Sequence, residues 1–385
     1  MKRRKLIFGA IWLLSLVVIS FFGGAVSYGF FFAMTLLPIT SLIYLLYAHL
    51  VLKVQQSLDA LELVGGQEVP YSYRIKNEGR LGITSVRFEM YDEYVDWRES
   101  PKREEYELMP EDEFVFTTML SCKYRGEYEL GIRKIVATDL LRLFCKEKTI
   151  GRILRVKVRP KIVNLNEIKA ISEIITLQSE NAAEKTEPDA VVRDYVRGDS
   201  IKKVHWKASA KTGELKTRTD IGEVKKGISI LLDITSYSKE RAVYLPLENK
   251  MLEVLVSLGY YFTTRHMPVS VFFGKENSLI SSLQDFENFY NKTEEIGFLP
   301  QESFSVRLQE LFESGILSES KVFLGICHEL NESIIGVAEQ LASMEMQVVL
   351  YVVTDEDISQ YSVYESANIK IIGLTTKTDL QQEGL

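Results

Sequence analysis

Residues 6–52 read LIFGAIWLLSLVVISFFGGAVSYGFFFAMTLLPITSLIYLLYAHLVL, and these 47 positions contain no Asp, Glu, Lys or Arg. The hydrocarbon core of a membrane takes about 20 helical residues, so this run is too long for one span and suits two. A glycine-rich break at 23–29 supplies turn-permissive residues near its middle. We therefore predict a transmembrane helical hairpin, with helices at about 6–22 and 30–52 and Pro38 tolerated inside the second.

Four positive charges at residues 2–5 precede the first predicted helix. Such charges hold a terminus in the cytoplasm, and two spans return the chain to the same side. We expect a multi-pass cell-membrane protein in contact with the lipid bilayer, with its N-terminus and residues 53–385 in the cytoplasm. The alternative is a cleaved signal peptide, which would leave 30–52 as the only span and the soluble part still in the cytoplasm.

The chain of 385 residues carries a net charge of −7, so everything after the four N-terminal positive charges carries −11. An acidic soluble part argues against nucleic-acid binding. Cys122, Cys145 and Cys327 have no paired spacing, which favours free thiols in a reducing compartment. The four histidines are scattered, and no Cys/His cluster has zinc spacing.

The soluble part divides by pattern. Apolar residues alternate with polar ones at Val69, Tyr71, Tyr73 and Ile75, which is typical of half-buried strands. Short strands with regular turns predict a β-sandwich domain of the immunoglobulin type over 53–163, and a small β-barrel is the alternative that gives the same pattern. The transmembrane hairpin before it occupies 1–52, a connector with a basic segment follows at 164–226, and a separate domain occupies 227–385.

The last domain alternates near-continuous apolar runs with amphipathic helical patterns. This alternation predicts a parallel sheet covered by helices on both faces, a doubly wound α/β domain. The predicted strands are 228–232, 269–273, 322–324, 348–353 and 369–372, and the predicted helices lie around 247–262, 304–312 and 334–342.

The connector contains a strongly basic segment. Eight Lys or Arg and three Asp or Glu lie between Arg193 and Arg218, a local net charge of +5. Such a patch suits an anionic lipid, a phosphate or an acidic partner surface. The alternative is that these charges pair with the protein's own acidic surface and that Trp206 packs in the interior.

The chain also resembles a known family. Arg193-Asp194-Tyr195-Val196-Arg197-Gly198-Asp199, followed by His205-Trp206-Lys207-Ala208-Ser209-Ala210-Lys211, resembles the signature of the bacterial domain of unknown function 58 family. Asn77–Gly79, Tyr124–Tyr128 and Thr138–Phe144 extend the resemblance. It implies two N-terminal spans, a β domain and a C-terminal domain like that of von Willebrand factor A. Members are often encoded beside MoxR-type AAA+ ATPases, so an AAA+ ATPase is the implied protein partner.

If this segment docks a protein partner, we expect eight signature residues to form the binding surface. They are Arg193, Tyr195, Gly198, Asp199, His205, Trp206, Lys207 and Ser209.

The von Willebrand factor A-like resemblance also implies a divalent metal at the end of the first strand. Asp233 and Thr235 match the first two ligand positions, but Tyr237 stands where a short hydroxyl belongs. The Asp expected after the strand at 322–326 is missing, since His328 and Glu329 occupy that region. A Mg²⁺ site at Asp233 and Thr235 is thus degenerate, and Asp233 capping its own loop is the simpler expectation. No other cofactor is predicted.

We predict from these patterns a non-catalytic, membrane-anchored cytoplasmic adaptor that docks protein partners. A metal-dependent binding module around Asp233 is the first alternative. An uncharacterised hydrolase with His205 as base near Asp199 is the second. The sequence lacks a phosphate-binding glycine loop, a His-Glu-x-x-His motif and a serine nucleophile elbow.

Overall fold

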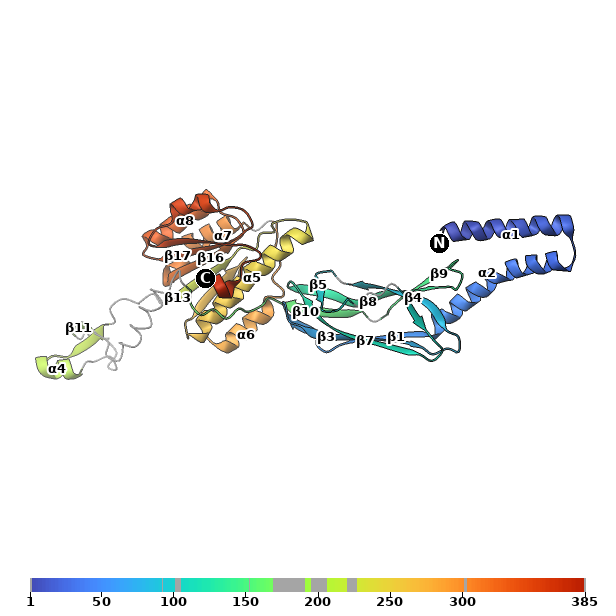
Figure 1. The fold of residues 1–385 in the computed structure, drawn as a ribbon. Coiled ribbons are helices and arrows are strands. Elements are labelled where there is room, and N and C mark those ends of the chain that lie inside the picture. The colour runs from blue at the N-terminus through green and yellow to red at the C-terminus, as the bar shows by residue number, and fades with distance from the viewer. Residues whose placement is uncertain are drawn as a thin grey trace. The chain divides into compact units, whose positions relative to one another are not determined.

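The computed structural model describes residues 2–91, 93–100, 105–151, 153–168, 191–194, 206–219, 227–300 and 303–383 (Figure 1). The chain divides into two compact units, Met1–Lys161 and Ile162–Leu385. The first contains the apolar N-terminal helices and the strand-rich domain. The second contains the mixed α/β domain. The two apolar helices and the α/β mixture confirm the coarse fold class that the sequence predicts.

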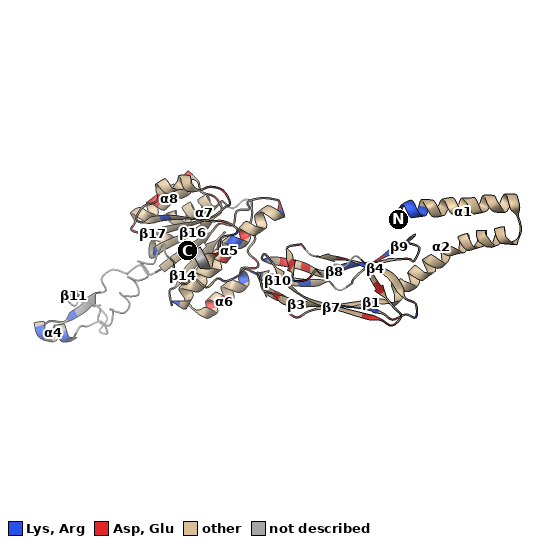
Figure 2. Ribbon diagram, in the orientation of Figure 1, with Lys and Arg blue, Asp and Glu red and all other residues tan. Residues whose placement is uncertain are grey.

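Two antiparallel helices open the chain, α1 (Lys2–Phe22) and α2 (Ala25–Val51), and both are long and apolar enough to cross a membrane. Figure 2 shows the basic residues of the hairpin gathered at the start of α1. The second helix begins at residue 25 and not at 30 as predicted. Gly23 and Gly24, at φ 58° and 88°, complete the turn alone. The helix can continue through Ser27, whose hydroxyl donates to the Gly23 carbonyl at 3.0 Å.

Two sheets form the rest of the first unit. The alternation predicted at 69–75 is confirmed, because Tyr71, Tyr73 and Ile75 are buried while their neighbours are more exposed. The first sheet has the order β1-β3-β7-β5, and the second has the order β2-β10-β8-β4-β6 with β9 paired to β8. The strands are β1 (Leu52–Leu58), β2 (Glu62–Val64), β3 (Val69–Asn77), β4 (Ile83–Tyr91), β5 (Val95–Trp97), β6 (Tyr106–Leu108), β7 (Glu113–Cys122), β8 (Gly126–Thr138), β9 (Cys145–Thr149) and β10 (Leu154–Arg159).

Both sheets share one apolar core, which also receives the end of α2. Tyr73 from the first sheet and Val156 from the second belong to it, together with Ala48 and Leu52 at the junction of α2 and β1. The helix therefore runs into the first strand without a linker. Burying these apolar side chains together ties the hairpin to the strand-rich domain.

The second unit is built on a six-stranded sheet in the order β15-β14-β13-β16-β17-β18, parallel except for β15. Helices α5 and α6 share a core with one face, and α7 and α8 share a core with the other. All five predicted strands and three predicted helices are present, whereas β15 and α6 were not predicted. The elements are β13 (Gly227–Leu232), α5 (Arg241–Thr264), β14 (Val269–Phe273), β15 (Glu276–Ile280), α6 (Leu283–Lys292), α7 (Phe304–Glu313), η3 (Ile316–Glu319), β16 (Ser320–Cys327), α8 (Glu332–Ser343), β17 (Gln347–Val353), η4 (Ser359–Tyr364), β18 (Ile369–Leu374) and α9 (Leu380–Glu383).

The order of the strands creates a switch point. The chain leaves β13 for β14 on one side and later places β16 on the other side of β13. In open α/β sheets, ligands bind outside the carboxyl ends of the strands at such a point. A binding site is therefore expected near Asp233 and His328, which directly follow β13 and β16.

Candidate functional site

The signature segment is described at its two ends. Strand β11 (Val191–Asp194) pairs antiparallel with β12 (Lys216–Thr219), which places Arg193 opposite Thr217. Helix α4 (Trp206–Thr212) lies between these two strands in the sequence and contains Trp206, Lys207 and Ser209. Tyr195, Gly198, Asp199 and His205 lie outside the described residues.

Local contacts hold α4 against β12. The Ser209 side chain is buried and its hydroxyl accepts a hydrogen bond from the Lys216 backbone N–H at 2.8 Å. Gly213, at φ 77°, ends the helix in the left-handed conformation and donates its N–H to the Ser209 carbonyl at 2.9 Å. Ser209 is thus a positioning residue within the segment.

Trp206 is 65% exposed, so the alternative in which it packs in the interior is not what this structure shows. Lys207 beside it is exposed, and Leu215 is 49% exposed. Figure 2 shows basic residues on α4. An exposed tryptophan is a residue type enriched at protein–protein contacts, and the lysines of α4 add positive charge around it.

A second group of residues meets at the switch point. Asp233 directly follows β13 and is 2% exposed. Its Oδ1 accepts the Thr235 backbone N–H at 2.8 Å, and its Oδ2 lies 2.7 Å from His328 Nδ1. The Tyr237 ring meets the His328 ring edge-on at 5.3 Å between centroids. The two predicted metal-site residues are therefore adjacent, and the imidazole that follows β16 joins them.

The electrostatics of this group follow from burial. Burial alone would lower the pKa of His328, but the Asp233 carboxylate, with help from Glu329, outweighs it and the net shift of the pKa is upward. Burial, and then the same two carboxylates, raise the pKa of Cys327 well above its usual range. Asp233 and His328 are thus buried side by side, and the upward shift of the His328 pKa favours the protonated imidazole beside the carboxylate.

A divalent cation fits this arrangement poorly. Hard cations need several oxygens converging on one point, and here the His328 imidazole lies against the Asp233 carboxylate where a metal would be drawn. Among the residues that the structure describes, no group of three His, Cys, Asp or Glu side chains is placed to hold a metal. The metal-dependent alternative stays a prediction, and in this geometry Mg²⁺ would have to displace His328.

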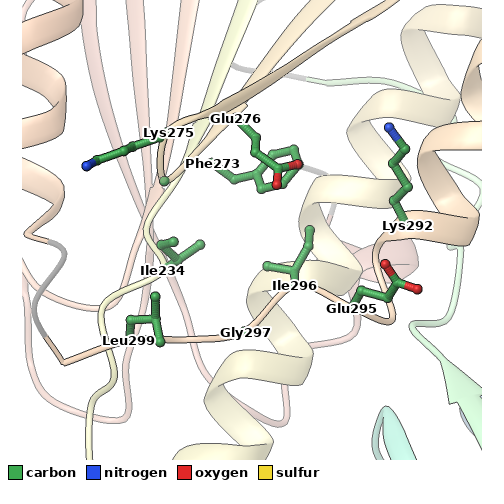
Figure 3. Close-up of a pocket in the computed structure, with 10 residues that line it drawn as sticks. Ile234, Phe273, Lys275, Glu276, Lys292, Glu295, Ile296, Gly297 and Leu299 are labelled. Carbon is green, nitrogen blue, oxygen red and sulfur yellow. The ribbon is translucent and has the colours of Figure 1, made fainter.

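A cavity of about 530 Å³ lies beside the end of β13 (Figure 3). Ile234, Ile296 and Leu299 form its apolar part, next to the turn between β14 and β15 and the segment after α6. Two lysines and two glutamates line it, so their charges balance and select neither a cation nor an anion. These lining residues are Lys275, Glu276, Lys292 and Glu295.

Sequence reasoning assigned no role to His328. Its signal was the departure itself, because a histidine stands in the segment where the family resemblance leads one to expect an aspartate. The hydrolase alternative rests on His205 and Asp199, which lie outside the described residues, and it stays a prediction.

No protein-family model matches the chain, and no curated protein matches it in sequence. Among solved structures, the cupredoxin domain of amoB from Nitrosocaldus yellowstonii is 8% identical, with a TM-score of 0.22, and the match covers 31% of this chain and 97% of that one. The CARDB domain of PF1109 from Pyrococcus furiosus is 19% identical, with a TM-score of 0.19, and the match covers 28% and 94%. Both TM-scores lie below 0.5, so neither likeness supports an argument about fold or function.

Proposed function

We propose that the protein is a membrane-anchored cytoplasmic adaptor that docks a protein partner without catalysing a reaction. The apolar hairpin supplies the anchor, and the strand-rich domain, which we assign to the immunoglobulin-like sandwiches, extends directly from α2. The second unit, which we assign to the von Willebrand factor A-like domains, carries the docking segment. The family resemblance supports a MoxR-type AAA+ ATPase as the partner.

One observation carries the proposal, namely the exposed Trp206 on the lysine-bearing helix α4. A large aromatic side chain left in water has apolar area to gain from a contact, and tryptophan is enriched among residues that dominate binding energy. The surrounding positive charge favours an acidic partner surface. The β11–β12 pairing and the Ser209–Lys216 hydrogen bond hold this helix, which lowers the ordering cost on binding.

A crosslinking pull-down of the tagged full chain from its native membrane, identified by mass spectrometry, tests the proposal. We expect the wild type to recover an AAA+ ATPase. Trp206→Ala should reduce the recovery by about tenfold or more, as for a binding-energy hot spot. Tyr364→Ala removes another exposed aromatic of the same unit and should leave the recovery unchanged.

Equal recovery by the wild type and Trp206→Ala would remove the docking role from α4. Recovery of no ATPase by the wild type would reject that partner. Circular dichroism and melting temperature of each variant show whether the fold is intact, so that a loss of binding is not confused with a loss of structure.

A further inference from the structure

A second cavity, of about 330 Å³, lies in the first unit between α1 and the strand-rich domain. We call it the arginine pocket. It is lined by Arg4 of α1, Arg87 of β4, Thr138 at the end of β8, Arg142 in the next loop and Glu105. Among the described lining residues, three guanidinium groups accompany one carboxylate, which gives a net charge of about +2. A cavity with this charge selects an anion.

The charged groups of the arginine pocket are accessible from solvent, whereas its threonine is part of the wall. Thr138 is 3% exposed. Glu105 accepts from Arg142 at 2.6 Å and orients that guanidinium, while Arg4 and Arg87 remain exposed. The exposed guanidinium groups can donate hydrogen bonds to an anion that enters the pocket.

The pocket lies where the hairpin meets the strand-rich domain. The loop after Thr138 contacts both apolar helices, because the Ser41 hydroxyl of α2 donates to the Asp139 carboxylate and the Lys5 ammonium lies 5.5 Å from the centre of the Phe144 ring. This is the level at which the charged start of α1 gives way to its apolar run. In a membrane, lipid headgroups occupy this level.

Apolar side chains are exposed at the same level. Leu140 and Leu141, in the loop beside Arg142, are 64% and 38% exposed. On α2, Ser41, Leu45 and Ala48 are buried while Leu42, Ile43 and Leu46 on other faces of the helix are exposed. The loop thus places arginine beside leucine, which suits a ligand that joins a phosphate to acyl chains.

The length of the apolar helix supports the same placement. Leu6–Phe22 rises about 25 Å, a few Å less than a hydrocarbon core of about 30 Å. A short span draws flanking residues toward the bilayer. Leu140 and Leu141 are exposed apolar residues of the loop after Thr138, and they would enter the bilayer next to this short span.

We propose that the arginine pocket binds the phosphate of an anionic phospholipid headgroup from the cytoplasmic leaflet. Arginine is suited to this ligand because its planar guanidinium donates two parallel hydrogen bonds to phosphate oxygens. A zwitterionic lipid brings its own cation, which the surplus positive charge repels. The inference rests on the membrane anchoring proposed above.

The test uses the full chain purified in a neutral detergent. Phosphatidylglycerol, phosphatidylcholine and inorganic phosphate are added separately, and melting temperature and lipid retention in native mass spectrometry are measured. We expect only phosphatidylglycerol to raise the melting temperature and to be retained. Arg87→Gln with Arg142→Gln should weaken its binding about tenfold or more for each lost charge-assisted contact. Arg155→Gln removes an exposed arginine outside the pocket and should change nothing.

Equal stabilisation by inorganic phosphate would overturn the lipid as ligand, and an undiminished phosphatidylglycerol effect in the double variant would overturn the site. If that variant does not fold, Arg87→Lys with Arg142→Lys keeps the charge but removes the paired guanidinium donors, and it should still weaken binding several-fold. Unchanged binding by this lysine variant would then overturn the proposal. Membrane fractionation separates this inference from the proposed anchor, because a membrane-bound chain with no preference for anionic lipid contradicts the inference alone.

Discussion

Asp233 carries a buried carboxylate at the end of a central strand, and a charge in that position needs a counter-charge. Protonated His328 supplies it from the end of the neighbouring strand, 2.7 Å away. Tyr237 packs edge-on against the imidazole. The Thr235 backbone N–H and the His328 side chain thus contact both oxygens of the carboxylate, which makes the pair a structural element of the switch point.

The pair predicts a pH-dependent contribution to stability. The folded pKa of His328 is raised, so its stabilising effect is fully present below the unfolded pKa of about 6.5 and is lost as the pH rises through the folded pKa. We expect His328→Gln to lower the free energy of unfolding by about 3 kcal/mol at about pH 6, and by less at about pH 9. Denaturant unfolding of both proteins across this range measures the difference.

His266→Asn is the control for that experiment. His266 is exposed and adopts a φ of 57°, a conformation that asparagine tolerates. It should leave the pH dependence as in the wild type. A His328→Gln deficit that is the same at about pH 6 and about pH 9 would show that the ion pair contributes nothing and that only packing was lost.

At the scale of elements, α2 is coupled to the strand-rich domain by two tyrosines. The Tyr47 hydroxyl accepts the Arg80 backbone N–H at 2.6 Å, and the Tyr44 hydroxyl donates to the Gly82 carbonyl at 2.8 Å. Gly79 is required at this junction, since a Cβ there would lie 2.3 Å from the Tyr47 hydroxyl oxygen. The loop before β4 therefore rests directly on the helix.

Removing these two hydroxyls should loosen the junction without opening the core. In Tyr44→Phe with Tyr47→Phe, we expect amide exchange at Arg80 to accelerate about fivefold, as for one lost hydrogen bond of about 1 kcal/mol. Hydrogen exchange followed by mass spectrometry of the loop peptide measures this. Tyr28→Phe, half-exposed on the other part of α2, should not alter the exchange rate. Unchanged exchange at Arg80 in the double variant would show that the helix does not support the loop.

Periodicity predicted the elements whose burial is repetitive. The alternation around Tyr71 and Tyr73 indicates a strand with one buried face, and that segment is a strand. The continuous apolar run at Val348–Val353 indicates a strand buried on both faces, and it is a strand as well. Strand β15 reads ENSLI, and its place at the sheet edge leaves it mostly exposed, so its sequence carries little apolar signal. The Asp233–His328 pair joins residues 95 positions apart, which only the strand order brings together.

For the molecule as a whole, the hairpin determines on which side of the membrane the soluble residues lie. If both helices cross the membrane, the basic start of α1 and everything after α2 lie on the same side, and that side is cytoplasmic by the charge rule. The arginine pocket then faces the leaflet that is rich in anionic lipid. Partner docking and lipid contact thus depend on a single topology.

Maleimide labelling of the protein's own cysteines can test whether the strand-rich domain lies in the cytoplasm. Cys145 is exposed, whereas Cys122 and Cys327 are buried, and burial raises the pKa of Cys122 to about 11. A membrane-impermeant maleimide should therefore react with Cys145 alone among the three, because it needs an accessible thiolate. We expect no labelling of Cys145 in intact cells and labelling after permeabilisation. Ala25→Cys with Cys145→Ser, at the hairpin turn, should be labelled in intact cells.

Labelling of Cys145 in intact cells would place the strand-rich domain outside and contradict the adaptor proposal together with the cytoplasmic lipid site. The intact mass of the mature chain separates the remaining alternatives, because signal-peptide cleavage removes α1 and with it Arg4 of the arginine pocket. A chain that keeps α1 and shields Cys145 has the single arrangement in which the pocket meets cytoplasmic headgroups. Residues 53–385 then lie in the compartment where an ATP-driven partner operates.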